Sequence, residues 1–256
     1  MHPVLFNIGK FELPAYGALL VLAFLVATYF LKKEASRMGI DPQKTVDAAL
    51  IALLFGLLGA KILLILVDAK LYFSNPSLML GTLQSAGVVY GGIIGGAVAV
   101  VVYIRKRKMP LWTTLDTMVP FLALGIGLGR LSCLMAGCCY GIRYDGPLAL
   151  HFPDHPRCEA PPDIGLFPVQ ILSLLNGVVL CLVLVALLRK RAFEGQVLAA
   201  FFFLYSLTRG AIEFLRGDTV RGLWLGDSIS TSQLIAVFGA LFGIFLYLKK
   251  KKDALR

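Results

Sequence analysis

The stretch VDAALIALLFGLLGAKILLILV, residues 46–67, decides the fold class of this chain. Its length lies within the roughly 17 to 25 apolar residues that a helix needs to cross about 30 Å of hydrocarbon. Six further apolar runs of similar length cover residues 15–31, 87–104, 115–135, 168–188, 196–215 and 231–248. The sequence therefore predicts an all-α polytopic membrane protein with about seven transmembrane helices.

The composition also favours a membrane protein. Hydrophobic residues make up 58% of the 256 residues, charged residues make up 16%, and the mean hydropathy is +0.79. So few polar side chains cannot cover the surface of a soluble globule, whereas lipid covers apolar surface.

The net charge of +10 comes largely from basic clusters between alternate apolar runs. These clusters comprise Lys32, Lys33, Arg37, Lys44, residues 105–108, residues 189–191, residues 249–252 and Arg256. All of them fall on one side of a seven-pass chain, and by the positive-inside rule that side is the cytoplasm. We therefore expect the N-terminus outside and the C-terminus in the cytoplasm. The basic residues are expected to anchor this topology and attract anionic lipid, not nucleic acid.

The first apolar run is interpreted as a retained helix, because no small-residue cleavage pattern precedes its basic flank. We expect a single membrane domain, residues 1–256, with longer outer-side connections at about 68–86, 136–167 and 217–230. The middle connection holds five prolines and two of the histidines. Long loops inside compact proteins are usually functional or mobile, so a lid or docking surface and a plain connector both stay open.

Two arginines and one glutamate lie inside otherwise apolar runs: Arg130, Arg209 and Glu213. A charge at the centre of a membrane helix costs roughly 2.5 to 3.5 kcal/mol on insertion scales, so such residues normally face a protein interior or a polar cavity. Arg209 and Glu213 are four positions apart and can pair on one helix face, which one interpretation treats as purely structural. Arg130 has no obvious acidic partner in its own segment. Two guanidinium groups on separate helices suit a phosphate, such as that of a lipid headgroup.

The run at residues 87–104 contains two overlapping pairs of small residues, Gly91 with Gly95 and Gly92 with Gly96. Small residues let membrane helices approach closely. Tight helix packing is therefore an alternative to ligand contact for these glycines.

Several motifs occur in the order found in one known family. They are YG at residues 16–17, YGGIIG at 90–95, GRLSCLMAGCCYG at 129–141, FPVQILS at 167–173, YSLTRGAIEFLRGD at 205–218 and STSQLI at 230–235. Over most of its length the chain thereby resembles the phosphatidylglycerol prolipoprotein diacylglyceryl transferase family.

This resemblance implies a multi-pass enzyme of the bacterial cytoplasmic (inner) membrane, with its active site toward the outer leaflet and no cofactor or metal. Members transfer the diacylglyceryl group of phosphatidylglycerol to the lipobox cysteine thiol of a prolipoprotein, forming a thioether and releasing glycerol phosphate. By position, the resemblance implies catalytic roles for Arg130, Arg209, Glu213 and Tyr90. It implies substrate binding by Tyr16, Arg130, Gly91, Gly92, Gly137 and Gln170. Guanidinium groups in a dry site would stabilise the charge that develops on the leaving phosphate.

The chain departs from the family at several signature positions. Tyr90 stands where well-known members have a histidine that is a leading candidate for accepting the thiol proton. Tyrosine, with a pKa near 10, is a poor base at neutral pH, so Tyr90 needs activation or only hydrogen-bonds the substrate. Signature asparagines appear as Cys133 and Ala136, a glutamate appears as Cys138, and an arginine of the second run appears as Lys61.

Four of the five cysteines, Cys133, Cys138, Cys139 and Cys158, lie near or beyond the outer end of the fourth run. An oxidising periplasm permits disulfides, so a bridge from Cys158 to Cys138 or Cys139 is one interpretation. Metal binding together with a histidine is less favoured, because the spacing lacks paired C-x-x-C units. Thiol redox chemistry is disfavoured for the same reason.

Two functional classes follow from the sequence. The first is the lipid-to-protein transferase. The second is a non-transferase membrane relative, which either binds or transports a phospholipid or acts through its cysteine thiols.

Overall fold

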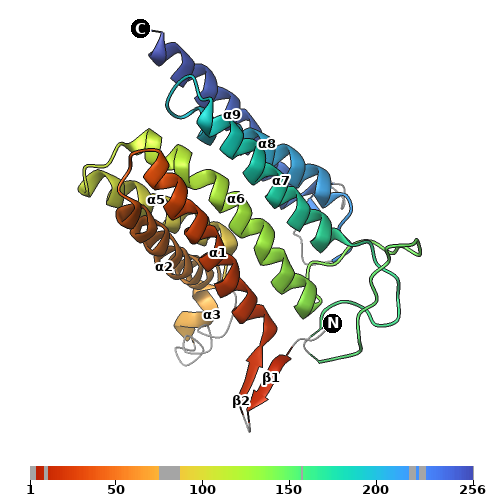
Figure 1. The fold of residues 1–256 in the computed structure, drawn as a ribbon. Coiled ribbons are helices and arrows are strands. Elements are labelled where there is room, and N and C mark those ends of the chain that lie inside the picture. Colours follow the sequence, from red (N-terminus) through yellow and green to blue (C-terminus); the bar gives the residue numbers. More distant parts are fainter. Residues whose placement is uncertain are drawn as a thin grey trace. The chain divides into compact units, whose positions relative to one another are not determined.

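The computed structural model describes residues 4–8, 11–74, 87–156, 158–218, 223–224 and 229–255, and most of them are helical (Figure 1). The elements in chain order are β1 (Val4–Ile8), β2 (Phe11–Pro14), α1 (Ala15–Arg37), α2 (Pro42–Val67), α3 (Ala69–Ser74), α5 (Val89–Lys106), α6 (Leu111–Ala136), α7 (Val169–Arg189), α8 (Gln196–Glu213), β3 (Leu223–Trp224), β4 (Ile229–Ser230) and α9 (Thr231–Ala254). Among the described helices, α1, α2, α5, α6, α7 and α9 are long and apolar enough to cross a membrane. The chain is therefore a polytopic helical membrane protein, as predicted, with two short antiparallel hairpins, β1–β2 and β3–β4.

The predicted run at residues 196–215 forms α8, whose 18 residues include Arg209 and Glu213. These charged residues lower its mean hydropathy, so α8 does not join the six helices whose composition alone suits a membrane. The prediction of seven spans, with the N-terminus outside, stays a prediction.

Contacts divide the chain into two compact units, Leu31–Thr114 and a second unit that combines Met1–Phe30 with Leu115–Arg256. We call the first the glycine unit and the second the pocket unit.

In the glycine unit, α2 packs directly along α5. A Cβ atom added at Gly91 would collide with the backbone oxygen of Gly59, and one added at Gly95 would collide with that of Phe55. Glycine is therefore required on this face of α5, because the two helix backbones touch with no side chain between them. The start of α2 is capped by Asp41, whose side chain accepts hydrogen bonds from backbone N–H groups in the first turn.

In the pocket unit, α6, α7, α8 and α9 run alongside one another (Figure 1). The backbones of α6 and α7 touch at Gly127 and Gly177, where a Cβ on either residue would meet the other helix. Helix α9 approaches α8 in the same way through Gly243, next to the backbone of Ala199 and Phe203. Helix α7 also packs against α8, and residues 130, 170 and 209 of α6, α7 and α8 line one pocket.

A fully buried carboxylate near the start of α6 fixes the connection between α7 and α8. Asp116 accepts a hydrogen bond from the Nη1 atom of Arg191 at 3.1 Å. It also accepts backbone N–H groups from Gly195 at 2.8 Å and Leu198 at 2.9 Å. Three donors satisfy this charge in the interior, so its role is structural.

The predicted connection at residues 136–167 is packed, although it lacks long strands. Phe152, Ala160 and Leu166 are almost completely buried and form a small apolar cluster. Backbone hydrogen bonds tie the connection to the segment after α8, from Gly217 to the oxygen of Tyr140 at 3.0 Å and from Ile142 to the oxygen of Leu215 at 3.0 Å. The connection thus holds the ends of α6 and α8 side by side, and a function as a lid stays a prediction.

The other two predicted connections are described only in part. Helix α3 occupies the beginning of the connection at residues 68–86, of which residues 75–86 lie outside the described residues. The connection at residues 217–230 contains β3 and β4, which pair antiparallel.

Candidate functional site

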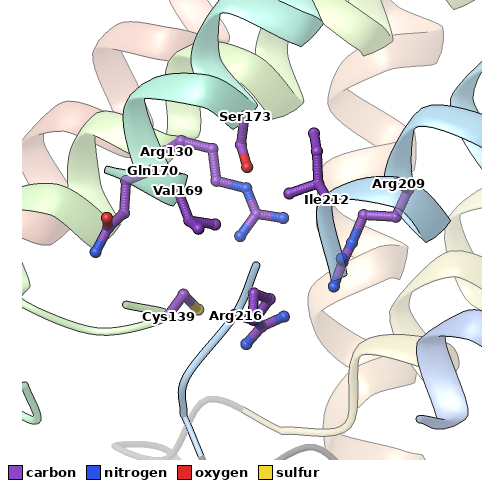
Figure 2. Close-up of a pocket in the computed structure, with 8 residues that line it drawn as sticks. All are labelled: Arg130, Cys139, Val169, Gln170, Ser173, Arg209, Ile212 and Arg216. Atoms are coloured by element: carbon purple, nitrogen blue, oxygen red, sulfur yellow. The ribbon is translucent and has the colours of Figure 1, made fainter. Parts of the chain in front are cut away.

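One pocket of the pocket unit gathers three arginine side chains (Figure 2). Helices α6, α7 and α8 and the two connections that follow α6 and α8 all contribute to its wall. The lining residues are Arg130, Cys139, Val169, Gln170, Ser173, Arg209, Ile212 and Arg216. A second hollow shares Arg130, Ser173, Arg209 and Ile212 with the first. It continues between α6, α7 and α8 to Asn176 and Tyr205, so the polar pocket extends into the helix bundle.

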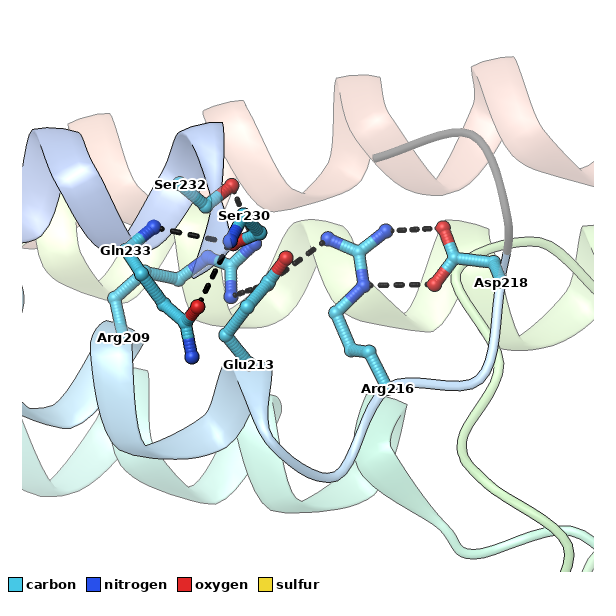
Figure 3. Close-up of polar contacts among 7 residues, drawn as sticks. All are labelled: Arg209, Glu213, Arg216, Asp218, Ser230, Ser232 and Gln233. Carbon is cyan, nitrogen blue, oxygen red and sulfur yellow. Dashed lines mark hydrogen bonds and ion pairs between the residues drawn. The ribbon is translucent and has the colours of Figure 1, made fainter. Parts of the chain in front are cut away.

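Two of the three guanidinium groups are held by a chain of ion pairs (Figure 3). Arg209 donates from Nη1 to the Oε2 atom of Glu213, one turn along α8. The same oxygen lies 3.5 Å from the Nη1 atom of Arg216. Arg216 also binds Asp218 with two parallel hydrogen bonds, Nε to Oδ1 at 2.9 Å and Nη2 to Oδ2 at 2.5 Å. Because the Glu213 side chain is only 1% exposed, one buried carboxylate orients both arginines.

Arg130 differs from the other two arginines. No carboxylate pairs with it among the residues that the structure describes, whereas Arg209 and Arg216 each contact one or two. Its electrostatic neighbours include Cys133, Tyr205, Cys139 and the like-charged Arg216. In Figure 2 its guanidinium group points into the space between α7, α8 and Cys139. Arg130 is therefore the arginine of this pocket whose charge no described carboxylate balances.

Gln170 supplies a hydrogen-bond acceptor beside the arginines. Its side chain is 2% exposed, and its Nε2 atom donates to the backbone oxygen of Cys138 at 3.0 Å. Its Oε1 atom has no hydrogen-bond donor among the described residues. A buried acceptor without a donor is costly, so this oxygen is available to a hydroxyl or amide of a ligand.

The turn that ends α6 brings thiol groups to the pocket. Gly137 adopts a left-handed conformation with φ +68°, and the N–H of Cys138 donates to the oxygen of Cys133 at 3.1 Å. This six-to-one bond after a left-handed glycine is the Schellman pattern of helix termination. A second left-handed residue follows at Cys139, with φ +54°. The chain therefore folds back, and the Sγ atoms of Cys133, Cys138 and Cys139 lie within 4.8 Å of one another.

The surroundings of this turn lower the pKa of one thiol and raise the pKa of another. Hydrogen bonds with the thiols of Cys133 and Cys138 lower the pKa of Cys139, and the nearby charges of Arg216 and Arg130 lower it further. Hydrogen bonding to its neighbours raises the pKa of Cys138. For Arg216, burial opposes the charged form, but the hydrogen bond to Asp218 and the nearby negative groups together outweigh burial and raise the pKa. Cys139 is thus the thiol that the pocket favours as a thiolate.

All five cysteines lie in the described part of the chain and are free thiols. The predicted bridge from Cys158 to Cys138 or Cys139 is therefore absent. Cys158 instead packs against the apolar cluster of residues 152, 160 and 166, with its Sγ atom at the place that a Cβ on Gly137 would fill. Cys181 is buried in α7, as expected.

The chain is similar to proteins of one known family over nearly its whole length. A family model described as prolipoprotein diacylglyceryl transferase matches residues 3–249. The chain belongs to this family. It is 36% identical to a phosphatidylglycerol–prolipoprotein diacylglyceryl transferase of Clostridium tetani, over 96% of this chain and 97% of the relative. It is 34% identical to the second such enzyme of Clostridium perfringens, over 99% and 98%, and 29% identical to that of Synechococcus elongatus, over 94% and 85%.

Several residues expected from the diacylglyceryl transferase family lie together in the pocket unit. Arg130, Arg209 and Gln170 line the pocket. Glu213 binds Arg209 directly beside them. Tyr16, at the start of α1, interacts electrostatically with Arg130 and with the three clustered thiols. Gly137 shapes the turn without lining the pocket.

The remaining family positions, Tyr90, Gly91 and Gly92, belong to α5 of the glycine unit. Gly91 and Gly92 face the backbone of α2, next to Gly59 and Gly56. Helix packing therefore accounts for both glycines, and their predicted contact with substrate stays a prediction. The same holds for the predicted catalytic role of Tyr90.

The site also contains four residues that were not predicted from the sequence, Arg216, Asp218, Cys139 and Ser173. A signal for Arg216 was present, because it follows Glu213 by three positions and can share its carboxylate. Cys139 gave no such signal, since only the left-handed turn after α6 directs it into the pocket.

Proposed function

We propose that this chain transfers the diacylglyceryl group of phosphatidylglycerol to the lipobox cysteine thiol of prolipoproteins. The names of its relatives in Clostridium and Synechococcus support these substrates. The observation that carries the proposal is the pocket with three guanidinium groups, of which Arg130 has no carboxylate partner among the described residues. Family membership favours this activity over the phospholipid-transport and thiol-protein alternatives.

The phosphate of phosphatidylglycerol is the ligand that suits the arginines. A phosphodiester carries one negative charge, and planar guanidinium groups donate paired hydrogen bonds to phosphate oxygens. Two carboxylates, Glu213 and Asp218, pair with Arg209 and Arg216. Arg130 thus provides the uncompensated positive charge for the phosphate, and Arg209 provides a second, pre-oriented donor.

The arginines contribute most as the carbon–oxygen bond breaks. The sulfur of the acceptor cysteine attacks the glyceryl carbon next to the phosphate ester, and the bonding electron pair leaves with glycerol phosphate. The leaving group gains a negative charge in this step. Donors that are already fixed by Glu213 stabilise that charge without reorganising, which is worth far more in a dry pocket than in water. In this account Arg130 and Arg209 are catalytic residues, and Glu213 positions Arg209 and Arg216.

Two further residues suit the polar headgroup and the acceptor. The free Oε1 atom of Gln170 accepts a hydrogen bond from a headgroup hydroxyl. Tyr16 is 43% exposed and interacts with Arg130, so its phenol suits the entrance through which a substrate reaches the pocket. Gly137 contributes indirectly, because its left-handed conformation sets the turn that carries Cys139.

The membrane location follows the charge pattern of the sequence. Basic residues near residues 105–108, 189–191 and 249–252 assign those ends of the helices to the cytoplasm. Arg130, Gln170 and Arg209 lie at the opposite ends of α6, α7 and α8 in the predicted topology. The pocket then faces the outer leaflet of the bacterial cytoplasmic membrane, where secreted prolipoproteins emerge.

The test is a transfer assay with purified protein, phosphatidylglycerol vesicles and a lipobox peptide. We expect a thioether product from the unmodified protein and a rate lower by about 100- to 1000-fold for Arg130→Ala, the usual range for removing one donor to a developing anion. Arg143→Ala is the matched control, because its side chain is 77% exposed and forms only a surface pair with Asp145. Absence of product from well-folded protein, or equal rates for Arg130→Ala and Arg143→Ala, would contradict the proposal.

A further inference from the structure

Three cysteines at the end of α6 form a cluster that the proposed chemistry has not used. The Sγ atoms of Cys133, Cys138 and Cys139 all lie within 4.8 Å of one another. Zinc binds thiolate sulfur at about 2.3 Å with tetrahedral angles, which separates the sulfur atoms by about 3.8 Å. The cluster is therefore near the spacing of three ligands around one ion.

The backbone holds this arrangement by several independent contacts. The left-handed conformations of Gly137 and Cys139 reverse the chain after α6. The hydrogen bond from Cys138 N–H to the oxygen of Cys133 closes the reversal, and Gln170 from α7 fixes the oxygen of Cys138. A non-glycine residue such as Cys139 adopts a left-handed conformation only when its surroundings require it. The turn thus directs a pair of adjacent cysteines toward the third.

Two cationic side chains of the pocket, Arg130 and Arg216, lie beside Cys139 in the pocket wall. Zinc and three thiolates carry one net negative charge, and Arg130 and Arg216 act electrostatically on Cys139. Zinc prefers sulfur ligands in structural and catalytic sites and has no redox chemistry of its own. Calcium and magnesium prefer oxygen ligands, so three sulfur atoms disfavour both ions.

We propose that Cys133, Cys138 and Cys139 bind a zinc ion, and that the fourth ligand of this ion is the thiol of the acceptor cysteine. The identity of the fourth ligand rests on the proposed transferase function, whereas the three-thiol zinc site does not. Cys139 lines the arginine pocket, so an ion bound there borders the place where the acceptor reacts.

The proposed zinc site explains how the thiol of the acceptor cysteine loses its proton. A thiol that coordinates zinc loses its proton, which leaves to solvent water as the Zn–S bond forms. The bound thiolate then forms the C–S bond with the glyceryl carbon, and the C–O electron pair leaves with glycerol phosphate. No separate protein base is needed for this step, which matters because Tyr90 replaces the family histidine.

The first test measures the metal itself. Protein purified under reducing conditions with added zinc is expected to retain about one zinc per chain, with three sulfur neighbours at about 2.3 Å by X-ray absorption. We expect Cys139→Ala and Cys138→Ala to lose this zinc, and Cys181→Ala to retain it as the matched control, because Cys181 is buried in α7 outside the cluster. Zinc bound through nitrogen and oxygen, retention by Cys139→Ala, no zinc in the unmodified protein, or a disulfide within the cluster of protein isolated from cells would overturn the site.

The second test adds the acceptor. A lipobox peptide is expected to raise the number of sulfur neighbours of zinc from three to four, whereas the same peptide with serine in place of cysteine leaves it at three. An unchanged spectrum with a peptide that is nevertheless converted to product would refute the fourth ligand and leave the transferase function intact. Full transfer activity in zinc-free protein would likewise refute the fourth ligand and leave the transferase function intact. A four-sulfur spectrum without any transfer would refute the proposed function and leave the metal site intact.

Discussion

The α2–α5 interface of the glycine unit and the α6–α7 interface of the pocket unit both depend on glycine, but they differ in what lies beside the contact. Along α5, Gly91, Gly92, Gly95 and Gly96 each face the backbone of α2, so the contact continues over two turns. Between α6 and α7, Gly127 and Gly177 make one such contact. Directly beyond it, Arg130 and Ser173 line the polar pocket.

Close packing at glycine therefore has a different consequence in each interface. A continuous row of glycines joins two helices so closely that no ligand fits between their backbones. A single glycine pair fixes the distance between α6 and α7 and leaves the next turn free for polar side chains. We therefore expect changes in the first interface to reduce stability, and changes in the second to reduce activity as well.

Among changes at the two glycine interfaces, the largest effect is expected at Gly177. Gly177→Val places a branched side chain against the backbone of α6, where Gly127 and the oxygen of Ala123 leave no room. Helix α6 must move, and a displacement of about 1 Å at reacting groups can lower a rate by about 100-fold. We expect the value of kcat/KM to fall by about this factor in the protein that still folds. The measurement is the transfer assay on monodisperse protein, with Gly17→Val as the control, because Gly17 faces open space. Equal activity of the two variants would show that the α6–α7 spacing does not set the pocket.

The membrane class and nearly all of the long helices could be predicted from the sequence, because apolar runs of this length and hydropathy are typical of helices that span a membrane. The sequence also singled out Arg130, Arg209 and Glu213, since charges inside apolar runs require a special environment. Arg216 and Cys139 could not be predicted as site residues. Their positions depend on how the chain turns after α8 and after α6, respectively. The disulfide prediction failed for a related reason, because spacing along the chain does not reveal that Cys158 packs into an apolar cluster.

A smaller effect, on stability alone, is expected in the glycine unit. Gly91→Ala forces a methyl group against the oxygen of Gly59 and the Cβ of Leu63, and overpacking of this kind typically costs about 1 to 3 kcal/mol. Thermal unfolding in detergent is expected to shift to lower temperature, while Gly17→Ala leaves it unchanged. Activity per folded molecule should stay near that of the unmodified protein. A large loss of activity without a loss of stability would instead favour the predicted substrate contact of Gly91.

The smallest effect is expected at Glu213. Glu213→Gln removes the charge that orients Arg209 and Arg216 but keeps the shape of the side chain. We expect a fall of about 10-fold in kcat/KM, equivalent to about 1.4 kcal/mol. Glu34→Gln is a matched control, because Glu34 is also buried and pairs with an arginine one turn away, Arg37, at 3.3 Å. If both variants lose activity equally, the ion-pair chain has no special role in the pocket.

The most direct test of the central claim is an experimental structure of the protein with phosphatidylglycerol bound. We expect the lipid phosphate in the pocket of Figure 2, in contact with the guanidinium group of Arg130 and within reach of Arg209. A phosphate bound elsewhere on the protein, with the guanidinium group of Arg130 turned away from it, would contradict the account.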